Sequence, residues 1–148
     1  MDVILFSDGG SRGNPGPAAC GIIIKVNGVQ QSFGYYLGEL TNNQAEYLGL
    51  QLGLIQLQRI VKNLSVNKVI ICMDSELVIR QMTGNYKVRD GKLQPIFRQI
   101  SKLIGQLPMV QFNHIPRGQN EAADQMVNDT LDAIYGLKNT TESTYPKP

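Results

Sequence analysis

The hydrophobic residues of this chain fall into short continuous runs and into stripes of helical spacing. Residues 3–6 are apolar at consecutive positions, and so is the predicted strand 68–73 after its first residue, Lys68. Such runs are typical of strands covered on both faces. Asn27-Gly28 separates two further apolar runs and indicates a hairpin, because both turn positions tolerate a positive φ. The five predicted strands are 3–6, 18–26, 29–37, 68–73 and 109–115.

The predicted helices carry apolar residues three and four positions apart. The clearest stripe runs from Leu93 to Ile104, and Pro95 is tolerated because it lies in the first turn. Thr41-Asn42 opens the first helix with side chains that can cap its free amides. The four predicted helices are 41–61, 75–82, 93–104 and 120–135.

The order of these elements defines the fold class. Three strands come first, and helices then alternate with the two remaining strands. An antiparallel start followed by this alternation predicts an α/β fold with a mixed sheet that carries helices. The doubly apolar strands, 3–6 and 68–73, are expected at its centre. We expect one domain over residues 1–136 and a polar, mobile tail over residues 137–148.

The composition indicates which class of protein this is and in which compartment it occurs, but it does not indicate the function. The 148 residues are 42% hydrophobic and 18% charged, which supplies a buried core and disfavours disorder. No apolar run approaches the ~20 residues that span a bilayer, and the N-terminus lacks a signal peptide's basic region. We therefore expect a cytoplasmic protein without a membrane partner, with Cys20 and Cys72 as buried free thiols. The net charge of +2 does not by itself suggest a nucleic-acid partner.

Four acidic residues occupy positions typical of ligand sites. Asp8 and Asp74 each follow a doubly apolar strand, whereas Glu46 and Asp124 lie in the first turns of helices. If the four converge, their repulsion raises pKa values or is balanced by bound cations. Hard oxygen ligands favour Mg²⁺ or Mn²⁺, and two such ions serve in-line phosphoryl displacement. Any one of these acids alone is more often a turn or cap residue, so the hypothesis depends on all four.

Polar neighbours extend this hypothesis. Asn42 and Asn43 lie within one turn of Glu46 and suit sugar-phosphate recognition, although helix capping would explain one of them. Asn120 precedes Asp124 by four residues and has the same two interpretations.

Three other features are candidates for substrate contacts. His114, the only histidine, ends the fifth predicted strand and suits proton transfer to a leaving group. Gly9 and Gly10 are expected to let a substrate backbone approach Asp8. Between residues 80 and 102 there are six basic residues and one acid. The loop residues Lys87 and Arg89 are the best candidates there for holding a phosphate backbone.

Four motifs together resemble type 1 ribonuclease H over about residues 3–134. They are Asp8-Gly9-Gly10-Ser11-Arg12-Gly13-Asn14-Pro15-Gly16-Pro17, Thr41-Asn42-Asn43-Gln44-Ala45-Glu46, Met73-Asp74-Ser75, and His114 through Asp124. The short linker Gly84-Asn85-Tyr86-Lys87-Val88 is similar to that of the compact bacterial, archaeal and plant-like branch, which lacks a basic protrusion.

This resemblance implies a ribonuclease H-like fold, with a five-stranded mixed sheet flanked by helices, over residues 1–136. It implies hydrolysis of the RNA strand of RNA–DNA hybrids by two Mg²⁺ ions, with Mn²⁺ as a substitute, leaving 5′-phosphate and 3′-hydroxyl ends. The metal-binding catalytic carboxylates would be Asp8, Glu46, Asp74 and Asp124.

The resemblance also assigns the other site residues. His114 matches the family's mobile catalytic histidine, and Asn14, Asn42 and Asn43 match residues that contact the hybrid's minor groove. Such short polar side chains can read 2′-hydroxyl groups there. Arg117 lies close enough to His114 in sequence to share its role and to bind nucleic acid.

The chain departs from the family pattern at Glu76, where many members carry a substrate-contacting Gln. Two alternatives stay open: a non-catalytic module that binds hybrids or double-stranded RNA, and an integrase-like or resolvase-like nuclease acting on DNA. The complete set of acids argues against the first, and the Asn42-Asn43 pair argues for RNA. We expect a monomer.

Overall fold

The computed structural model describes residues 1–142, with side chains described through residue 136. The predicted order of strands and helices is confirmed, with a short 3-10 helix, η1, added before the last helix. The strands are β1 (Asp2–Ser11), β2 (Gly16–Val26), β3 (Val29–Leu40), β4 (Lys68–Met73) and β5 (Met109–His114). The helices are α1 (Asn42–Val61), α2 (Glu76–Met82), α3 (Gln94–Gly105), η1 (Arg117–Gln119) and α4 (Glu121–Glu142). None of the helices in this described part is long and apolar enough to cross a membrane.

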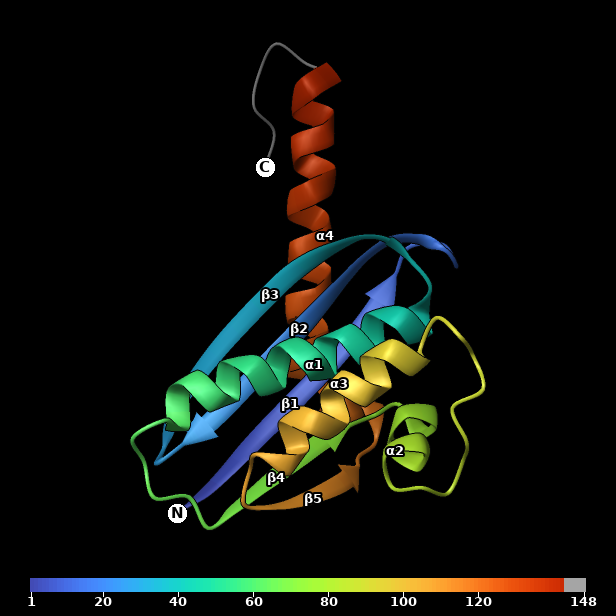
Figure 1. Ribbon diagram of the computed structural model, residues 1–148. Helices are drawn as coiled ribbons and strands as arrows, with labels where there is room; N and C mark the ends of the chain where they lie inside the picture. Colours follow the sequence, from blue (N-terminus) through green and yellow to red (C-terminus); the bar gives the residue numbers. More distant parts are fainter. Residues whose placement is uncertain (143–148) are drawn as a thin grey trace.

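The five strands form one mixed sheet in the order β3-β2-β1-β4-β5 (Figure 1). The β1–β2 and β2–β3 pairs are antiparallel, and the β1–β4 and β4–β5 pairs are parallel. The two doubly apolar strands are neighbours, and β1 is the middle strand, as the sequence predicts. Phe6 pairs with Cys72 in the parallel register, so the chain positions of Asp8 and Asp74 come level with each other just beyond this pair.

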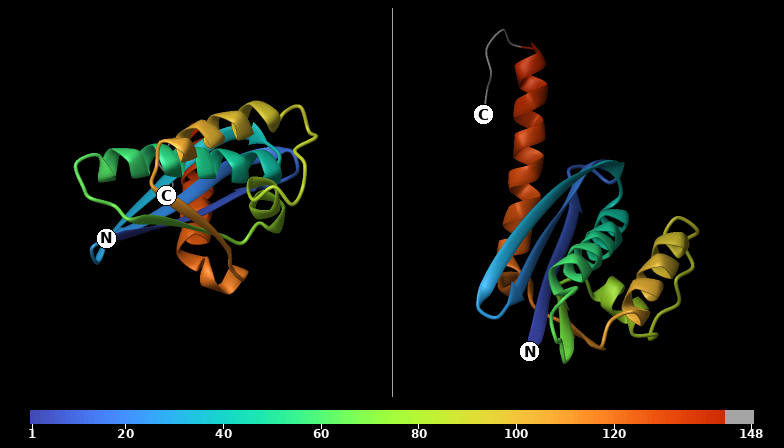
Figure 2. Two further views of the ribbon diagram at one scale, coloured as in Figure 1. Left: turned by 60° about the horizontal axis from the view of Figure 1, so that its bottom comes forward. Right: turned by 60° about the vertical axis from the view of Figure 1, so that its left-hand side comes forward.

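Helices cover both faces of the sheet. Figures 1 and 2 show α1 and α3 on one face and α4 on the other. Successive β1 side chains alternate between these layers, as pleating requires. Val3 and Leu5 belong to the main core with α1, where both are fully buried. Ile4, Phe6 and Asp8 have the opposite parity, so the Asp8 carboxylate faces the α4 layer.

The strand β1 is longer than predicted, and this corrects the position of Asp8. Its apolar run stops at Phe6, but its pairing with β2 continues from Asp8 opposite Gly21 to Ser11 opposite Ala18. Backbone hydrogen bonding needs no apolar side chain, so the hydrophobic pattern underestimates the strand. Asp8 therefore lies within a strand, where pairing with β2 holds its backbone beyond the last residue paired with β4, Phe6.

The last helix also continues beyond its predicted end. The apolar spacing predicts an end near Tyr135, but α4 runs to Glu142 and projects past the sheet (Figure 1). A glycine inside a helix costs about 1 kcal/mol relative to alanine, so Gly136 alone does not end it. The predicted tail thus begins as helix, and residues 143–148 lie outside the described residues. Cys20 and Cys72 are buried and free, as predicted.

Candidate active site

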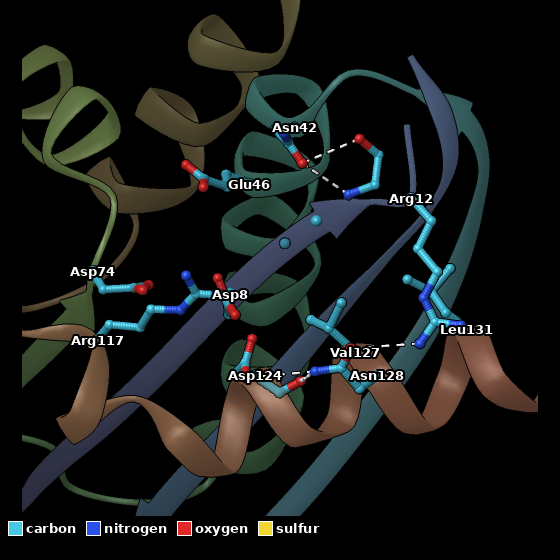
Figure 3. Close-up of a pocket in the computed structure, with 13 residues that line it drawn as sticks. Asp8, Arg12, Asn42, Glu46, Asp74, Arg117, Asp124, Val127, Asn128 and Leu131 are labelled. Carbon is cyan, nitrogen blue, oxygen red and sulfur yellow. Dashed lines mark hydrogen bonds between the residues drawn. The ribbon is translucent and has the colours of Figure 1, made fainter. Parts of the chain in front are cut away.

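Four carboxylates from four different elements line one cavity of about 370 Å³ (Figure 3). Asp8 comes from β1, Glu46 from α1, and Asp124 from the first turn of α4, while Asp74 directly follows β4. Asp8 is only 9% exposed. The structure thus brings together the four acids that the sequence singles out, from positions as far apart as residues 8 and 124.

Two glycines allow the two helical layers to reach Asp8. A Cβ atom on Gly9 would lie 2.3 Å from the main-chain carbonyl of Ala45, and one on Gly21 would lie 2.0 Å from the Ala123 carbonyl oxygen. Real Cβ contacts are never this short, so each glycine permits a close helix–strand approach. Glu46 and Asp124 directly follow these two contacts along the helices. On its α1 side, Gly9 makes room for the helix, and Gly9 and Gly10 both line the cavity beside Asp8. Their expected role in letting a substrate backbone approach Asp8 stays a prediction.

Burial and mutual repulsion make two of the carboxylates hard to ionise. Burial, followed by the charges of Asp74, Glu46 and Asp124, raises the pKa of Asp8 from 3.8 to about 8. Burial also raises the pKa of Glu46 from 4.5 to about 7, aided by the charge of Asp74 and opposed by a hydrogen bond from Ser75. The protonated, uncharged forms of Asp8 and Glu46 are therefore favoured until a cation binds near them.

Asn120 holds Asp74 rather than facing solvent. Its Nδ2 atom donates to Asp74 Oδ1 at 3.0 Å and to the Ser7 carbonyl oxygen at 3.0 Å. The residue is only 2% exposed, which corrects its expected role as a nucleic-acid contact. It also does not cap α4 with its side chain. Asn120 instead connects the start of α4 to the two central strands and fixes one carboxylate oxygen of Asp74.

A second polar contact reaches Asp124, through two residues that the sequence patterns above do not mark as functional, Asn128 and Arg12. Asn128 Nδ2 donates to the main-chain oxygen of Asp124 at 3.1 Å and to its Oδ2 atom at 3.4 Å. Arg12 donates to Asn128 Oδ1 at 3.5 Å and to Asp132 Oδ1 at 2.7 Å. The spacing of four residues between Asp124 and Asn128, which was used for Asn42 and Glu46, is the signal that could have found Asn128.

His114 and Arg117 occupy different positions at the site. The exposed His114 ring places Nε2 3.3 Å from the main-chain oxygen of Asp74, and His114 is not among the residues that line the cavity. Arg117, on η1, lines the cavity itself, and its side chain extends toward Asp8 and Asp74 (Figure 3). The cation at the carboxylates is thus Arg117, while His114 stands beside the end of β4.

The asparagines that are predicted to contact nucleic acid also connect the glycine-rich loop to the start of α1. Asn42 Oδ1 accepts from the Ser11 backbone at 2.9 Å and from its hydroxyl at 3.1 Å. Asn14 Oδ1 accepts from the Asn42 backbone at 3.0 Å. Asn43 is exposed beside them. The capping predicted at this helix start belongs to Thr41, whose hydroxyl accepts from the Gln44 backbone, so neither asparagine is needed as the cap.

The basic loop lies outside the carboxylate cavity. Lys87 and Arg89 are both exposed, and Lys87 lines a separate depression of about 510 Å³ together with Tyr86 and Arg98. Buried Gln81 anchors this loop by donating to the Lys87 carbonyl at 3.2 Å. The structure therefore separates the predicted phosphate contacts from the predicted catalytic residues.

The donors at the cavity fit a divalent cation by their chemistry. Carboxylate oxygens are the ligands preferred by hard ions such as Mg²⁺, and their uncompensated charge favours a cation. Among residues whose side chains are described, no three Asp, Glu, His or Cys groups are already arranged to hold a metal ion. Binding an ion there would therefore require the carboxylate side chains to adjust.

Comparisons with known proteins agree with this arrangement. Residues 6–130 match the family model described as Reverse transcriptase-like. The chain is 37% identical over 136 residues to a bifunctional protein of Mycobacterium tuberculosis, covering 90% of this chain and 36% of the relative. It is 30% identical over 151 residues to ribonuclease HI of Pseudomonas syringae pv. tomato, covering 92% and 96% of the two chains.

A solved structure is similar over nearly all of its length. The crystal structure of LC11-RNase H1 in complex with an RNA/DNA hybrid has a TM-score of 0.84 and 40% sequence identity, covering 90% of this chain and 99% of that chain. The chain thus spans about a third of the mycobacterial relative, but almost the full length of the Pseudomonas protein.

Proposed function

The chain belongs to the ribonuclease H family, and from this premise we propose that it hydrolyses the RNA strand of RNA–DNA hybrids. The proposed reaction is endonucleolytic and leaves 5′-phosphate and 3′-hydroxyl ends. The observation that carries this proposal is the convergence of four carboxylates on one cavity, with the pKa values of Asp8 and Glu46 raised to about 8 and about 7.

The proposed cofactor is Mg²⁺, with Mn²⁺ as a substitute. The residues that would hold it are Asp8, Glu46, Asp74 and Asp124. When two such ions are bound, they supply an activated hydroxide and stabilise the leaving oxygen of a phosphodiester. The protein's own contribution is to fix the carboxylates, and Asn120 does this for Asp74 through its 3.0 Å hydrogen bond.

Two nearby residues have proposed roles, one in proton transfer and the other in phosphate binding. His114, beside the end of β4, would give a proton to the leaving group. Arg117 would bind a substrate phosphate, since its guanidinium extends into the cavity and can donate to two phosphate oxygens (Figure 3). Because His114 and Arg117 occupy different positions, we propose that each has its own role rather than that the two share one.

Recognition of RNA is proposed for the asparagines beside the glycine-rich loop. The Oδ1 atoms of Asn14 and Asn42 accept hydrogen bonds from the protein, which leaves their NH₂ groups to donate to a substrate. A 2′-hydroxyl oxygen accepts such bonds, and DNA lacks this group. Selectivity for the RNA strand with little base preference follows.

The proposed function is tested by cleavage of duplexes with one end-labelled strand. RNA–DNA, RNA–RNA and DNA–DNA duplexes are incubated with Mg²⁺, Mn²⁺ or EDTA, and product ends are identified by ligation and phosphatase treatment. We expect metal-dependent cleavage of the RNA strand in the hybrid, and none by Asp74→Asn, whose fold is checked by circular dichroism. Binding without cleavage would indicate a non-catalytic module, and DNA cleavage would indicate an integrase-like nuclease; either would overturn the proposal.

A further inference from the structure

A row of polar side chains connects the glycine-rich loop to the carboxylate of α4. Asp124, Asn128 and Asp132 are spaced by four residues, so they lie on one face of the helix. Arg12, from the segment between β1 and β2, reaches this face and contacts Asn128 (Figure 3). It also contacts Asp132, one turn further along the helix. The row ends at the cavity, where Asn128 contacts Asp124.

The chemistry of Arg12 determines which way the Asn128 amide faces. A guanidinium has five donors and no acceptor. Its Nη2 atom lies 3.5 Å from Asn128 Oδ1, so the amide oxygen turns toward Arg12. The NH₂ group must then face Asp124, where it donates to Oδ2 at 3.4 Å. The opposite amide orientation would place two oxygens against each other at Asp124.

Asp132 in turn holds the guanidinium in place. It accepts from Arg12 Nη2 at 2.7 Å, with side-chain exposures of 44% for Arg12 and 67% for Asp132. An ion pair this exposed adds little to the stability of the fold. Replacing Arg12 should therefore change the active site while leaving the stability of the fold almost unchanged.

We infer that Arg12 is a positioning residue, which orients the Asp124 carboxylate through the Asn128 amide. This inference rests on the proposed function, because it gives Arg12 a task in the same reaction. It also explains why Arg12, Asn128 and Asp124 all line the cavity from two segments far apart in the sequence.

The test compares Arg12→Ala, Asn128→Ala, the double variant and Arg12→Lys. Arg59→Ala serves as the control, since it removes the same charge from an exposed position thirteen residues beyond Glu46 on α1, about 20 Å along the helix. Hybrid cleavage gives kcat and KM. Calorimetric titration of each protein with MgCl₂, without nucleic acid, gives the affinity for the ion.

We expect Arg12→Ala to lower both kcat and Mg²⁺ affinity about tenfold with KM little changed, as for other residues that orient metal ligands. Asn128→Ala should have a similar effect. The double variant should be no worse than Asn128→Ala, because both substitutions break the same row of contacts. Arg12→Lys keeps a donor-only group and should recover most of the loss, and Arg59→Ala should match the wild type.

Other outcomes would overturn the inference. An increase in KM at unchanged kcat, with a weaker salt dependence, would make Arg12 a phosphate contact instead. Losses that multiply in the double variant would mean that Arg12 and Asn128 act independently. If the wild type binds Mg²⁺ but cleaves no hybrid, the proposed function fails, whereas the calorimetric comparison still decides the role of Arg12.

Discussion

Asn120 and Asp74 are joined by a hydrogen bond of 3.0 Å from the amide nitrogen to Oδ1, although 46 residues separate them. Because Asn120 is 2% exposed and also donates to the Ser7 carbonyl oxygen, its amide offers Asp74 a donor at a fixed position. We expect Asn120→Ala to lower kcat roughly 10–100-fold, as is usual when the support of a metal ligand is removed.

Measurements of kcat and of urea unfolding test this expectation, with Asn67→Ala, at an exposed position before β4, as the control. In the absence of metal, Asn120→Asp should lower the free energy of unfolding more than Asn120→Ala does, because it places another negative charge beside Asp74. Wild-type kcat in Asn120→Ala would contradict the positioning role.

The glycines beside Asp8 provide a prediction for stability. Gly9→Ala and Gly21→Ala would place Cβ atoms 2.3 and 2.0 Å from helix main-chain atoms. Main-chain atoms cannot move aside as a flexible side chain can, so each substitution should destabilise the fold by about 3 kcal/mol or more, at the upper end for overpacking. Gly91→Ala, with no atom within 4 Å of the new Cβ, is the matched control. Equal urea midpoints for the three variants would refute the close-packing account.

The raised pKa of Asp8 predicts a pH-dependent cost in the metal-free protein. Since folding raises this pKa from 3.8 to about 8, its contribution to stability is fully present below pH 3.8 and is lost as pH rises toward 8. Each pKa unit corresponds to about 1.4 kcal/mol. At pH 8 in EDTA, the free energy of unfolding of Asp8→Asn should therefore be about 2–5 kcal/mol higher than that of the wild type. The difference should shrink toward pH 4.

Urea unfolding at several pH values measures this difference, with Asp2→Asn, at the exposed start of β1, as the control. Added Mg²⁺ should stabilise the wild type more than Asp8→Asn, because the ion compensates the charge that the substitution removes. A constant difference across the pH range would show that burial of the charge is not its source.

His114 is expected to assist the reaction without being essential. Its ring lies beside the Asp74 main-chain oxygen rather than among the cavity residues. We expect His114→Ala to lower kcat by about a hundredfold, the lower end for loss of a general acid. Single-turnover cleavage compares it with Asp74→Asn, and an equally complete loss in both variants would contradict an assisting role.

The exposed loop cations should contribute to affinity alone. Lys87 and Arg89 lie outside the carboxylate cavity, so replacing both with alanine should raise KM and leave kcat unchanged. Each lost phosphate contact lowers the dependence of log affinity on log salt by about one. Hybrid binding measured from low to moderate salt gives this slope, and Lys62→Ala/Arg59→Ala, at the far end of α1, controls for net charge.

The sequence predicted the fold and the carboxylate set because both follow from local signals. Apolar runs mark β1 and β4, and acids that follow such runs or open helices mark the site. The role of Gly9 could not be predicted this way, because it depends on which element packs against it. Asn120 was misassigned for the same reason: its spacing from Asp124 is local, whereas its partner, Asp74, comes from another part of the chain. Arg12 was overlooked because its contacts lie on α4, more than a hundred residues away.

The placement of Gly9 and Gly21 on opposite faces of the sheet has a consequence for how the protein acquires its activity. Glu46 reaches Asp8 only when α1 has docked on one face, and Asp124 reaches it only when α4 has docked on the other. The β1–β2 hairpin by itself carries one of the four acids. Asp74 joins them only when β4 has paired with β1. Binding of a divalent cation during refolding is therefore expected to return only after α1, β4 and α4 are all in place, so it reports completed assembly of the fold.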